Sequence, residues 1–292
     1  MEGVLNIFKP AGMTSHDVVS FLRREFKIKK IGHAGTLDPQ AAGVLPLCVG
    51  KATRLVEFLI EQDKEYLCEL TFGITTETQD AWGKIVKTGA CDQLALEKIK
   101  SKIPQFLGQI KQKIPAYSAV KVDGLPFYKR TRLGIETKPR FRQVHVYKID
   151  IIKYAPPRLT FMINCSKGTY VRTICHDLGE ALGVGGHMSF LLRTKVGNFT
   201  LAESITLEET VTLKEKALLP LEVCVEGMSQ IVLSEKELKK IKQGQMLFLS
   251  KPVPLLKNIA VFNDQGKLEA IAAIFIKNNN IILKPKKVLK RE

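Results

Sequence analysis

The sequence predicts an α+β protein in which a mixed, largely antiparallel sheet is flanked by helices and followed by a small β-barrel-like domain. Three observations favour this fold class. Several segments alternate apolar and polar residues, as strands with one buried face do, whereas strands of a parallel sheet are continuously apolar. The sequence shows no strand–helix–strand rhythm and no internal repeat. The 292 residues exceed the usual size of one domain, and the character of the chain changes near residues 220–230.

The first sixty residues predict two helices with a strand between them. Thr14 or Ser15 can cap a helix whose apolar stripe extends to Phe26. The apolar run VLPLCVG (44–50) is typical of a short buried strand. In ATRLVEFLIEQ (52–62) the apolar residues recur at helical spacing, which indicates the second helix.

The clearest alternation lies in KEYLCELTFG (64–73), where every second residue from Tyr66 to Phe72 is apolar. This segment predicts a strand with one buried face. A polar loop (74–84) leads into a short strand, and Asp92 is expected to cap the next helix.

Residues 115–142 lack apolar periodicity and are strongly basic. Seven Lys and Arg from Lys121 to Arg142 face only two acidic residues, and four aromatic residues are interleaved. A run of charge alone is typical of a solvated face, whereas the added aromatic residues favour a nucleic-acid-binding arm.

Two further strands (143–153 and 158–165) and one helix complete the sheet-forming part. The helix is predicted in KGTYVRTICHDLGEALG (167–183), and four of its residues are expected to face inward: Val171, Ile174, Leu178 and Leu182. We therefore expect a first domain over residues 1–228.

The remaining residues, 229–292, contain short strand-like segments separated by turns, which predicts a separate small β-barrel-like domain. This segment has 13 basic and 5 acidic residues and so carries half of the net charge of the chain. The surplus points to a second RNA-contacting surface, and a solvated shell is the alternative.

The net charge of +16 points to polyanionic partners, with nucleic acid ahead of an anionic membrane. No apolar run approaches the roughly 20 residues that span a bilayer, and the N-terminus lacks the pattern of a signal peptide. The six cysteines include no CxxC pair. We therefore expect a cytoplasmic protein without a disulfide framework.

Motifs for several other kinds of site are incomplete. Residues 43–53 lack the glycine and the Ser or Thr that a phosphate-binding P-loop requires. The five histidines have no metal-ligand spacing, and no serine lies in a GxSxG turn. These incomplete motifs argue against reactions that need a bound nucleotide, a metal or a serine nucleophile.

Asp38 lies in the Gly- and Pro-rich stretch IGHAGTLDPQAAGVLP (31–46), where an aspartate most often stabilises a turn. Two features favour a different role. Pro39 restricts the backbone of Asp38. Arg172 is expected in the first turn of a helix, where a cation meets the positive end of the helix dipole and a carboxylate partner would stabilise it. An ionised, positioned carboxylate is a usable nucleophile, although an Arg172 that faces solvent remains the alternative.

The chain resembles the TruB family of tRNA pseudouridine-55 synthases, in the bacterial form with a C-terminal PUA domain. The resemblance follows one order along nearly the whole chain and rests on six segments: FKPAGMTSHD (8–17), GHAGTLDPQAAGVLP (32–46), TTETQDAWG (75–83), PAYSAVK (115–121), SKGTYVRT (166–173) and FLLRTKVGNF (190–199).

The resemblance implies the pseudouridine synthase fold and a cofactor-free, metal-free enzyme. It makes Asp38 the nucleophile, Arg172 its ion-pair partner and Tyr66 a residue that stacks on the target uracil. It also places four residues at the substrate: His33, Tyr170, Leu191 and Asp80. The TTETQD segment has Glu77 where the family more often has Asp.

The resemblance further implies that uridine 55 of the tRNA T loop flips out of its stack and is isomerised to pseudouridine. The expected partner is the T stem-loop of tRNA, with the acceptor end contacted through the C-terminal domain. No membrane and no obligate protein partner are expected, and the protein is expected to be a monomer. A catalytically silent RNA-binding module and the catalytic subunit of a guide-RNA machine are the alternatives.

Overall fold

The computed structural model describes residues 1–118, 120–122, 124–135, 138–249 and 255–289. Its largest element is a nine-stranded sheet in which β1, β3, β12, β4, β11, β10 and β7 follow one another, while β2 pairs with β3 and β13 with β12. The strands of this sheet are β1 (Gly3–Lys9), β2 (Ile31–His33), β3 (Ala42–Val49), β4 (Lys64–Phe72), β7 (Gly108–Lys113), β10 (Phe141–Ala155), β11 (Arg158–Cys165), β12 (Gly186–Val196) and β13 (Phe199–Thr200).

All neighbouring strands of this sheet are antiparallel except β3 and β12, which run parallel. The prediction of a mixed, largely antiparallel sheet is therefore confirmed. The parallel contact is short and pairs Arg193 with Gly43. Gly43 has φ +113°, and a Cβ at this position would overlap the Arg193 backbone. A glycine is required here because the two strands approach closely.

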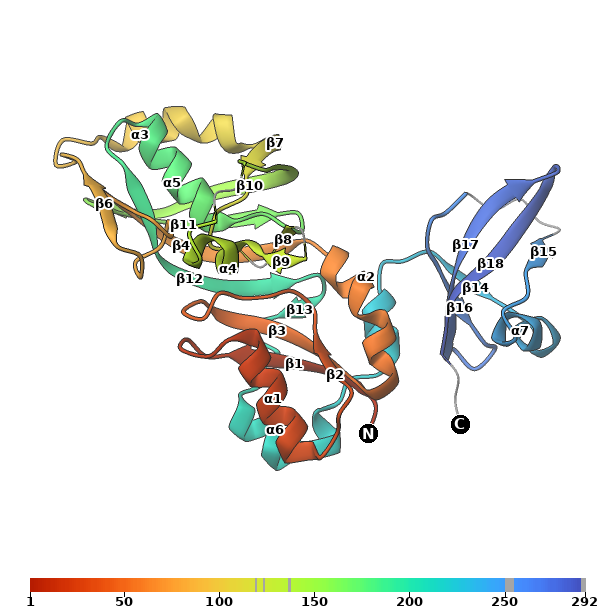
Figure 1. Cartoon of the computed structure of the whole chain (residues 1–292). Helices are drawn as coiled ribbons and strands as arrows, with labels where there is room; N and C mark the ends of the chain where they lie inside the picture. Colours follow the sequence, from red (N-terminus) through yellow and green to blue (C-terminus); the bar gives the residue numbers. More distant parts are fainter. Residues whose placement is uncertain (119, 123, 136–137, 250–254, 290–292) are drawn as a thin grey trace.

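Helices cover the sheet in two groups, shown in Figure 1. The helix α1 (Ser15–Phe26) lies with α6 (Leu207–Leu213) near β1 and β2, whereas α3 (Leu96–Lys102) and α5 (Val171–Ala181) lie near the other end of the sheet. The remaining helices are α2 (Val56–Glu61), α4 (Phe127–Arg132), α7 (Glu235–Lys242) and the 3-10 turns η1 (Gly50–Leu55), η2 (Ile103–Phe106), η3 (Lys214–Ala217) and η4 (Leu221–Val225).

Two short hairpins accompany the main sheet. One consists of β5 (Ile74–Thr76) and β6 (Ile85–Thr88), and the other consists of β8 (Lys121–Val122) and β9 (Leu125–Pro126). The loop expected at 74–84 thus begins with a strand. The basic segment 115–142 contains β8, β9 and α4, and several of its residues lie outside the described ranges.

A second sheet, the C-terminal sheet, follows with the order β14, β16, β17, β18 and β15. Its strands are β14 (Gln230–Val232), β15 (Leu247–Leu249), β16 (Ile259–Phe262), β17 (Leu268–Lys277) and β18 (Asn280–Val288). The curled C-terminal sheet agrees with the expected barrel-like architecture. Its helix α7 was not expected, although Ser234 and Glu237 form the reciprocal capping box that marks a helix start.

The C-terminal sheet packs on the rest of the chain through an apolar cluster. Phe262 and Leu268 belong to the same buried cluster as Val4 and Phe58. Lys287 pairs with Glu57 at 2.7 Å beside this cluster. In Figure 1 the C-terminal sheet lies beyond α2, to the right of the larger sheet.

The local predictions mostly hold where one face of an element is buried. The inward residues predicted for α5 are buried, and Tyr66 lies on the buried face of β4. The predicted cap at Asp92 is wrong, because α3 begins after Ala95 and has no side-chain cap. The backbone before it is held to the sheet instead, since the carbonyl of Leu94 accepts a hydrogen bond from the Tyr154 hydroxyl at 2.6 Å.

No helix among the described residues is both long and apolar enough to cross a membrane.

Candidate functional site

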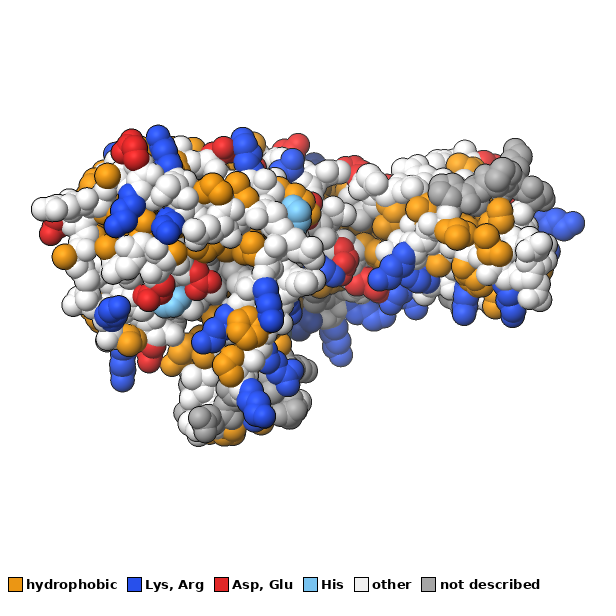
Figure 2. Space-filling view, turned by 90° about the horizontal axis from the view of Figure 1, so that it is seen from above, with side chains coloured by type: hydrophobic (Ala, Val, Ile, Leu, Met, Phe, Trp, Pro, Cys, Tyr) orange, Lys and Arg blue, Asp and Glu red, His pale blue; other side chains and the backbone are white. Residues whose placement is uncertain are grey.

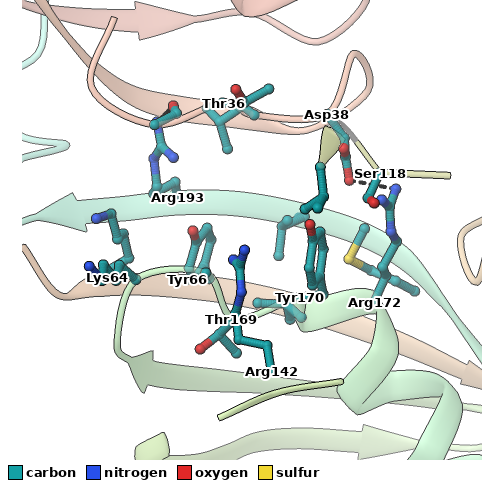
Figure 3. A pocket seen from close by; sticks show the side chains of 18 of the residues that line it. Thr36, Asp38, Lys64, Tyr66, Ser118, Arg142, Thr169, Tyr170, Arg172 and Arg193 are labelled. Carbon is teal, nitrogen blue, oxygen red and sulfur yellow. Dashed lines mark hydrogen bonds and ion pairs between the residues drawn. The ribbon is translucent and has the colours of Figure 1, made fainter. Parts of the chain in front are cut away.

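A cavity of about 340 Å³ opens beside β4 and β12 and under the loop between β2 and β3. Figure 3 shows the side chains that point into it. Five of the residues predicted or inferred from the sequence line this cavity: Asp38, Tyr66, Tyr170, Arg172 and Leu191. The structure therefore brings together residues from four separate segments of the chain.

Asp38 and Arg172 form an ion pair in this cavity. Arg172 Nη1 lies 2.8 Å from Asp38 Oδ2, and Arg172 Nη2 donates to the carbonyl of Tyr117 at 2.6 Å. Arg172 lies in the first turn of α5 and is buried. The pairing inferred from the sequence is therefore present, and the guanidinium also orders the start of the basic segment.

A buried lysine, Lys9, holds the backbone of the loop that carries Asp38. Lys9 Nζ donates to the carbonyls of Pro10, Met13 and Pro39 at 2.8, 2.6 and 3.1 Å. The Ser15 hydroxyl accepts a hydrogen bond from the backbone N–H of Leu37 at 2.9 Å. These contacts fix the backbone on both sides of Asp38.

Burial raises the pKa of Asp38 above its ordinary value, and the charge of Arg172 is the largest effect in the opposite direction. The neighbouring Asp80 raises this pKa further, while Lys9 lowers it. The ion pair with Arg172 thus favours the ionised form of a carboxylate whose pKa burial raises.

Asp80 does not line the cavity but lies behind Arg172. Its Oδ2 is 3.5 Å from Arg172 Nη1, and its Oδ1 accepts hydrogen bonds from the Thr78 hydroxyl and the Trp82 N–H. Asp80 therefore connects the β5–β6 hairpin to the Asp38–Arg172 pair. Its position suits holding the guanidinium better than contacting a ligand.

Tyr66 forms part of the cavity wall, next to the Arg193 guanidinium. Burial raises the pKa of Tyr66 to about 12, although the adjacent guanidinium acts in the opposite direction.

Arg193 is fully buried and has no carboxylate partner among the described residues. Its Nε donates to the carbonyl of Val44 at 2.7 Å and its Nη2 to the carbonyl of Gly35 at 3.1 Å. The residue thus joins β12 to β3 and to the loop before Asp38. The sequence reasoning missed Arg193, although its place two residues after Leu191 on a strand puts both side chains on one face.

Tyr170 and Leu191 line the same cavity. The backbone of Tyr170 is fixed by the buried side chain of Gln112, whose Oε1 accepts from the Tyr170 N–H at 2.8 Å and whose Nε2 donates to the Tyr170 carbonyl at 3.0 Å. The Tyr170 ring lies 5.8 Å from the Arg172 guanidinium carbon. Two aromatic rings and a leucine therefore provide an apolar surface beside the Asp38 carboxylate.

His33 does not line the cavity. It lies at the end of β2, opposite Leu47 of β3, and its Nδ1 is buried without a hydrogen-bond partner. Burial lowers the pKa of His33. Within the described residues, no group of three or more His, Cys, Asp or Glu is arranged to hold a metal ion.

Comparison with known proteins agrees with this geometry. Residues 23–171 match the family model described as "TruB family pseudouridylate synthase (N terminal domain)", and residues 172–226 match "tRNA pseudouridylate synthase B C-terminal domain". A protein of Alkaliphilus oremlandii named tRNA pseudouridine synthase B is 44% identical over 250 residues, which cover 85% of this chain and 83% of that protein. One of Heliobacterium modesticaldum with the same name is 40% identical and covers 100% of this chain and 96% of its own length.

Solved structures show the same fold. One chain from the "Crystal Structure of a Cbf5-Nop10-Gar1 Complex" has a TM-score of 0.78 and 29% identity, and the match covers 99% of this chain and 85% of that one. A chain from an H/ACA RNP bound to a substrate RNA containing 2'-deoxyuridine has a TM-score of 0.77 at 26% identity over similar shares of both chains. The chain therefore belongs to the TruB family of pseudouridylate synthases, which are isomerases.

Proposed function

We propose that this protein isomerises uridine 55 in the T loop of tRNA to pseudouridine, with Asp38 as the nucleophile and no cofactor. The observation that carries the proposal is the Asp38 carboxylate, which pairs with Arg172 at the side of an aromatic-lined cavity, on a loop whose Pro39 carbonyl is held by Lys9. The relatives named tRNA pseudouridine synthase B support the choice of tRNA.

The reaction requires rearrangement within one nucleoside. The N1–C1′ bond of uridine breaks, the uracil turns, and a C5–C1′ bond forms, while the hydrogen lost from C5 is balanced by one gained at N1. No oxidation and no phosphoryl transfer occurs. A carboxylate beside the nucleoside can add to the base or to C1′, or can remove a proton from C2′.

The shape of the cavity supports a flipped-out nucleotide. A base inside an RNA stack cannot reach a recessed carboxylate, so the target nucleotide must leave its stack first. We assign Tyr66 and Tyr170 to stacking against the extruded uracil and Leu191 to apolar contact with it. We assign Asp80 to orienting Arg172. His33, outside the cavity, would act on the RNA around the extruded base.

The charge distribution supports a polyanionic substrate. Figure 2 shows Lys and Arg side chains gathered between the larger part of the molecule and the C-terminal sheet. We propose residues 1–228 as the catalytic domain, residues 115–142 as an RNA-binding insertion and residues 229–292 as a PUA-like RNA-binding domain. The protein is proposed to act as a monomer.

The test is an Asp38→Asn variant, which keeps the size of the side chain and removes its charge. Purified protein is incubated with tRNA labelled with tritium at C5 of its uridines, because isomerisation releases that hydrogen to water. We expect no release by the variant and unchanged affinity for tRNA. Asp150→Asn is the matched control, since the side chain of Asp150 on β10 is about half exposed and pairs with Lys148 at 2.7 Å.

Release by Asp38→Asn at the wild-type rate would reject Asp38 as the nucleophile. The position is tested with a tRNA in which cytidine replaces uridine 55. Continued release from that tRNA would reject the proposed specificity while leaving the isomerase activity in place.

A further inference from the structure

The cavity is lined by five cationic side chains and one carboxylate. The cations are Lys64, Arg142, Lys167, Arg172 and Arg193, and the carboxylate is Asp38. Such an excess of positive charge beside a substrate site needs an explanation, because each buried or half-buried cation is stable only with partners that satisfy it.

Four of the five cations have such partners. Arg172 pairs with Asp38, and Arg193 donates to two carbonyls. The other two are held on neighbouring elements: Lys64 donates to the carbonyls of Ile60 and Gln62, and Lys167 pairs with Glu61.

Arg142 is the exception. Among the described residues, no ion pair or hydrogen bond satisfies its guanidinium, although the side chain is half-buried and lines the cavity. Figure 3 shows it pointing into the cavity from the side opposite the loop that carries Asp38. A fixed, unpaired guanidinium of this kind is a ready binding group for an anion.

Two neighbours fix the position of Arg142. On β10 it is paired in register with Gln112 of β7, so both side chains lie on the same face of the sheet. Gln112 in turn holds the backbone of Tyr170 at 2.8 and 3.0 Å. The guanidinium also lies against Gly168, where a Cβ would collide with Arg142 Nη1. Gly168 therefore leaves the space that the guanidinium occupies.

We propose that Arg142, packed against Gly168, binds a backbone phosphate that flanks the target uridine. This inference rests on the proposed function, because it is the RNA that brings the phosphate to the rim of the cavity when its base enters. The guanidinium suits this ligand, since its planar fork can donate two parallel hydrogen bonds to phosphate oxygens. Arg142 would thereby orient the nucleotide relative to Asp38 without contacting the reacting atoms.

The test compares Arg142→Gln with the wild type on synthetic T-arm hairpins. One hairpin is unmodified, and the others carry a single neutral methylphosphonate in place of the phosphate on the 5′ or the 3′ side of the target uridine. Affinity is measured by direct binding, which does not depend on turnover. Arg158→Gln is the matched control, because Arg158 is exposed and lies opposite Thr71, five residues from Tyr66 along β4. Its side chain makes an exposed ion pair of 3.9 Å with Glu69.

We expect Arg142→Gln to weaken binding of the unmodified hairpin about tenfold. The slope of log affinity against log salt should fall by about 0.7, the value for one phosphate contact on a single strand. One methylphosphonate should weaken wild-type binding by a similar factor and should not weaken the variant further. Arg142→Lys should restore part of the affinity but not all of it.

Equal losses in Arg142→Gln and Arg158→Gln would overturn the proposal. So would a methylphosphonate effect at both positions that is as large in the variant as in the wild type. If the proposed function failed, the wild type would bind the hairpins without releasing hydrogen from uridine 55. The coupling between Arg142 and the phosphate is measured by binding alone, so its outcome is independent of that release.

Discussion

Replacing Arg172 by Gln is expected to lower kcat about 10- to 150-fold at neutral pH. The change removes the charge-assisted hydrogen bond of 2.8 Å between Arg172 Nη1 and Asp38 Oδ2. Hydrogen bonds to charged groups contribute about 1.5–3 kcal/mol, which corresponds to that range when the loss is felt in the transition state. Thermal unfolding of the variant is measured alongside, because the loss of the buried Arg172 guanidinium from this ion pair also destabilises the fold.

The pH dependence separates charge from geometry. Burial raises the pKa of Asp38 and the Arg172 cation opposes that rise. Without the cation the pKa of Asp38 rises further, so the carboxylate ionises only at higher pH. The acid limb of the kcat profile, where kcat falls as the pH is lowered, therefore moves to higher pH. Arg172→Lys keeps the charge and so should keep the acid limb, but one ammonium cannot reach both Asp38 and the Tyr117 carbonyl, and kcat should still fall.

Tritium release measured from pH 5 to 9 provides the profile for all three proteins. An acid limb at the same pH in wild type and Arg172→Gln would refute the reasoning that the Arg172 charge keeps Asp38 ionised. A lysine variant with wild-type kcat would show that the forked geometry of the guanidinium is dispensable.

Three more predictions concern the groups around the site. Burial lowers the pKa of Lys9 from 10.5 to about 8, so the unfolded chain binds more protons than the folded one between these pH values. The free energy of unfolding of the wild type, relative to that of Lys9→Met, should therefore rise from pH 8 to 10. A difference that stays constant over this range in chemical denaturation would contradict this. Arg193→Met removes the donor to the carbonyls of Val44 and Gly35 and should cost about 2–5 kcal/mol of stability. It should also lower kcat, with partial rescue by Arg193→Lys. An unchanged kcat would show that the contact between Arg193 and Tyr66 has no catalytic role. Phe262→Ala should cost about 3 kcal/mol and lower the melting temperature of the whole chain in one transition, whereas calorimetry with a separate early transition would show that the C-terminal sheet unfolds alone.

Local patterns predict the elements of this fold where one face meets the core. The alternation in β4 and the helical spacing in α5 depend only on which residues are buried, and this is visible within about ten residues. The start of α3 is decided elsewhere, because the hydroxyl of Tyr154 holds the carbonyl of Leu94 from a strand 60 residues away. No local pattern contains that contact.

The same distinction applies to the site. A cation in the first turn of a helix is locally unfavourable, so the position of Arg172 predicts a carboxylate partner. Asp38, whose backbone is restricted by the following proline, is a reasonable candidate for that partner. Arg193 carries no such local signal. Its partners are backbone carbonyls of Gly35 and Val44, about 150 residues earlier, and backbone carbonyls are the same in every sequence. Side chains that bind backbone are therefore the hardest part of a site to predict.

Three of the buried cations around the site share this feature. Lys9, Lys64 and Arg193 are each held by backbone carbonyls, which are dipoles and do not neutralise the positive charge. A carboxylate partner for each would cancel their fields and leave Asp38 among other acids. Carbonyl partners instead satisfy the hydrogen bonds and leave a net positive potential at the cavity. Such a potential favours an ionised Asp38 and an incoming phosphodiester at the same time, so the charge beside the proposed nucleophile would also attract the RNA backbone.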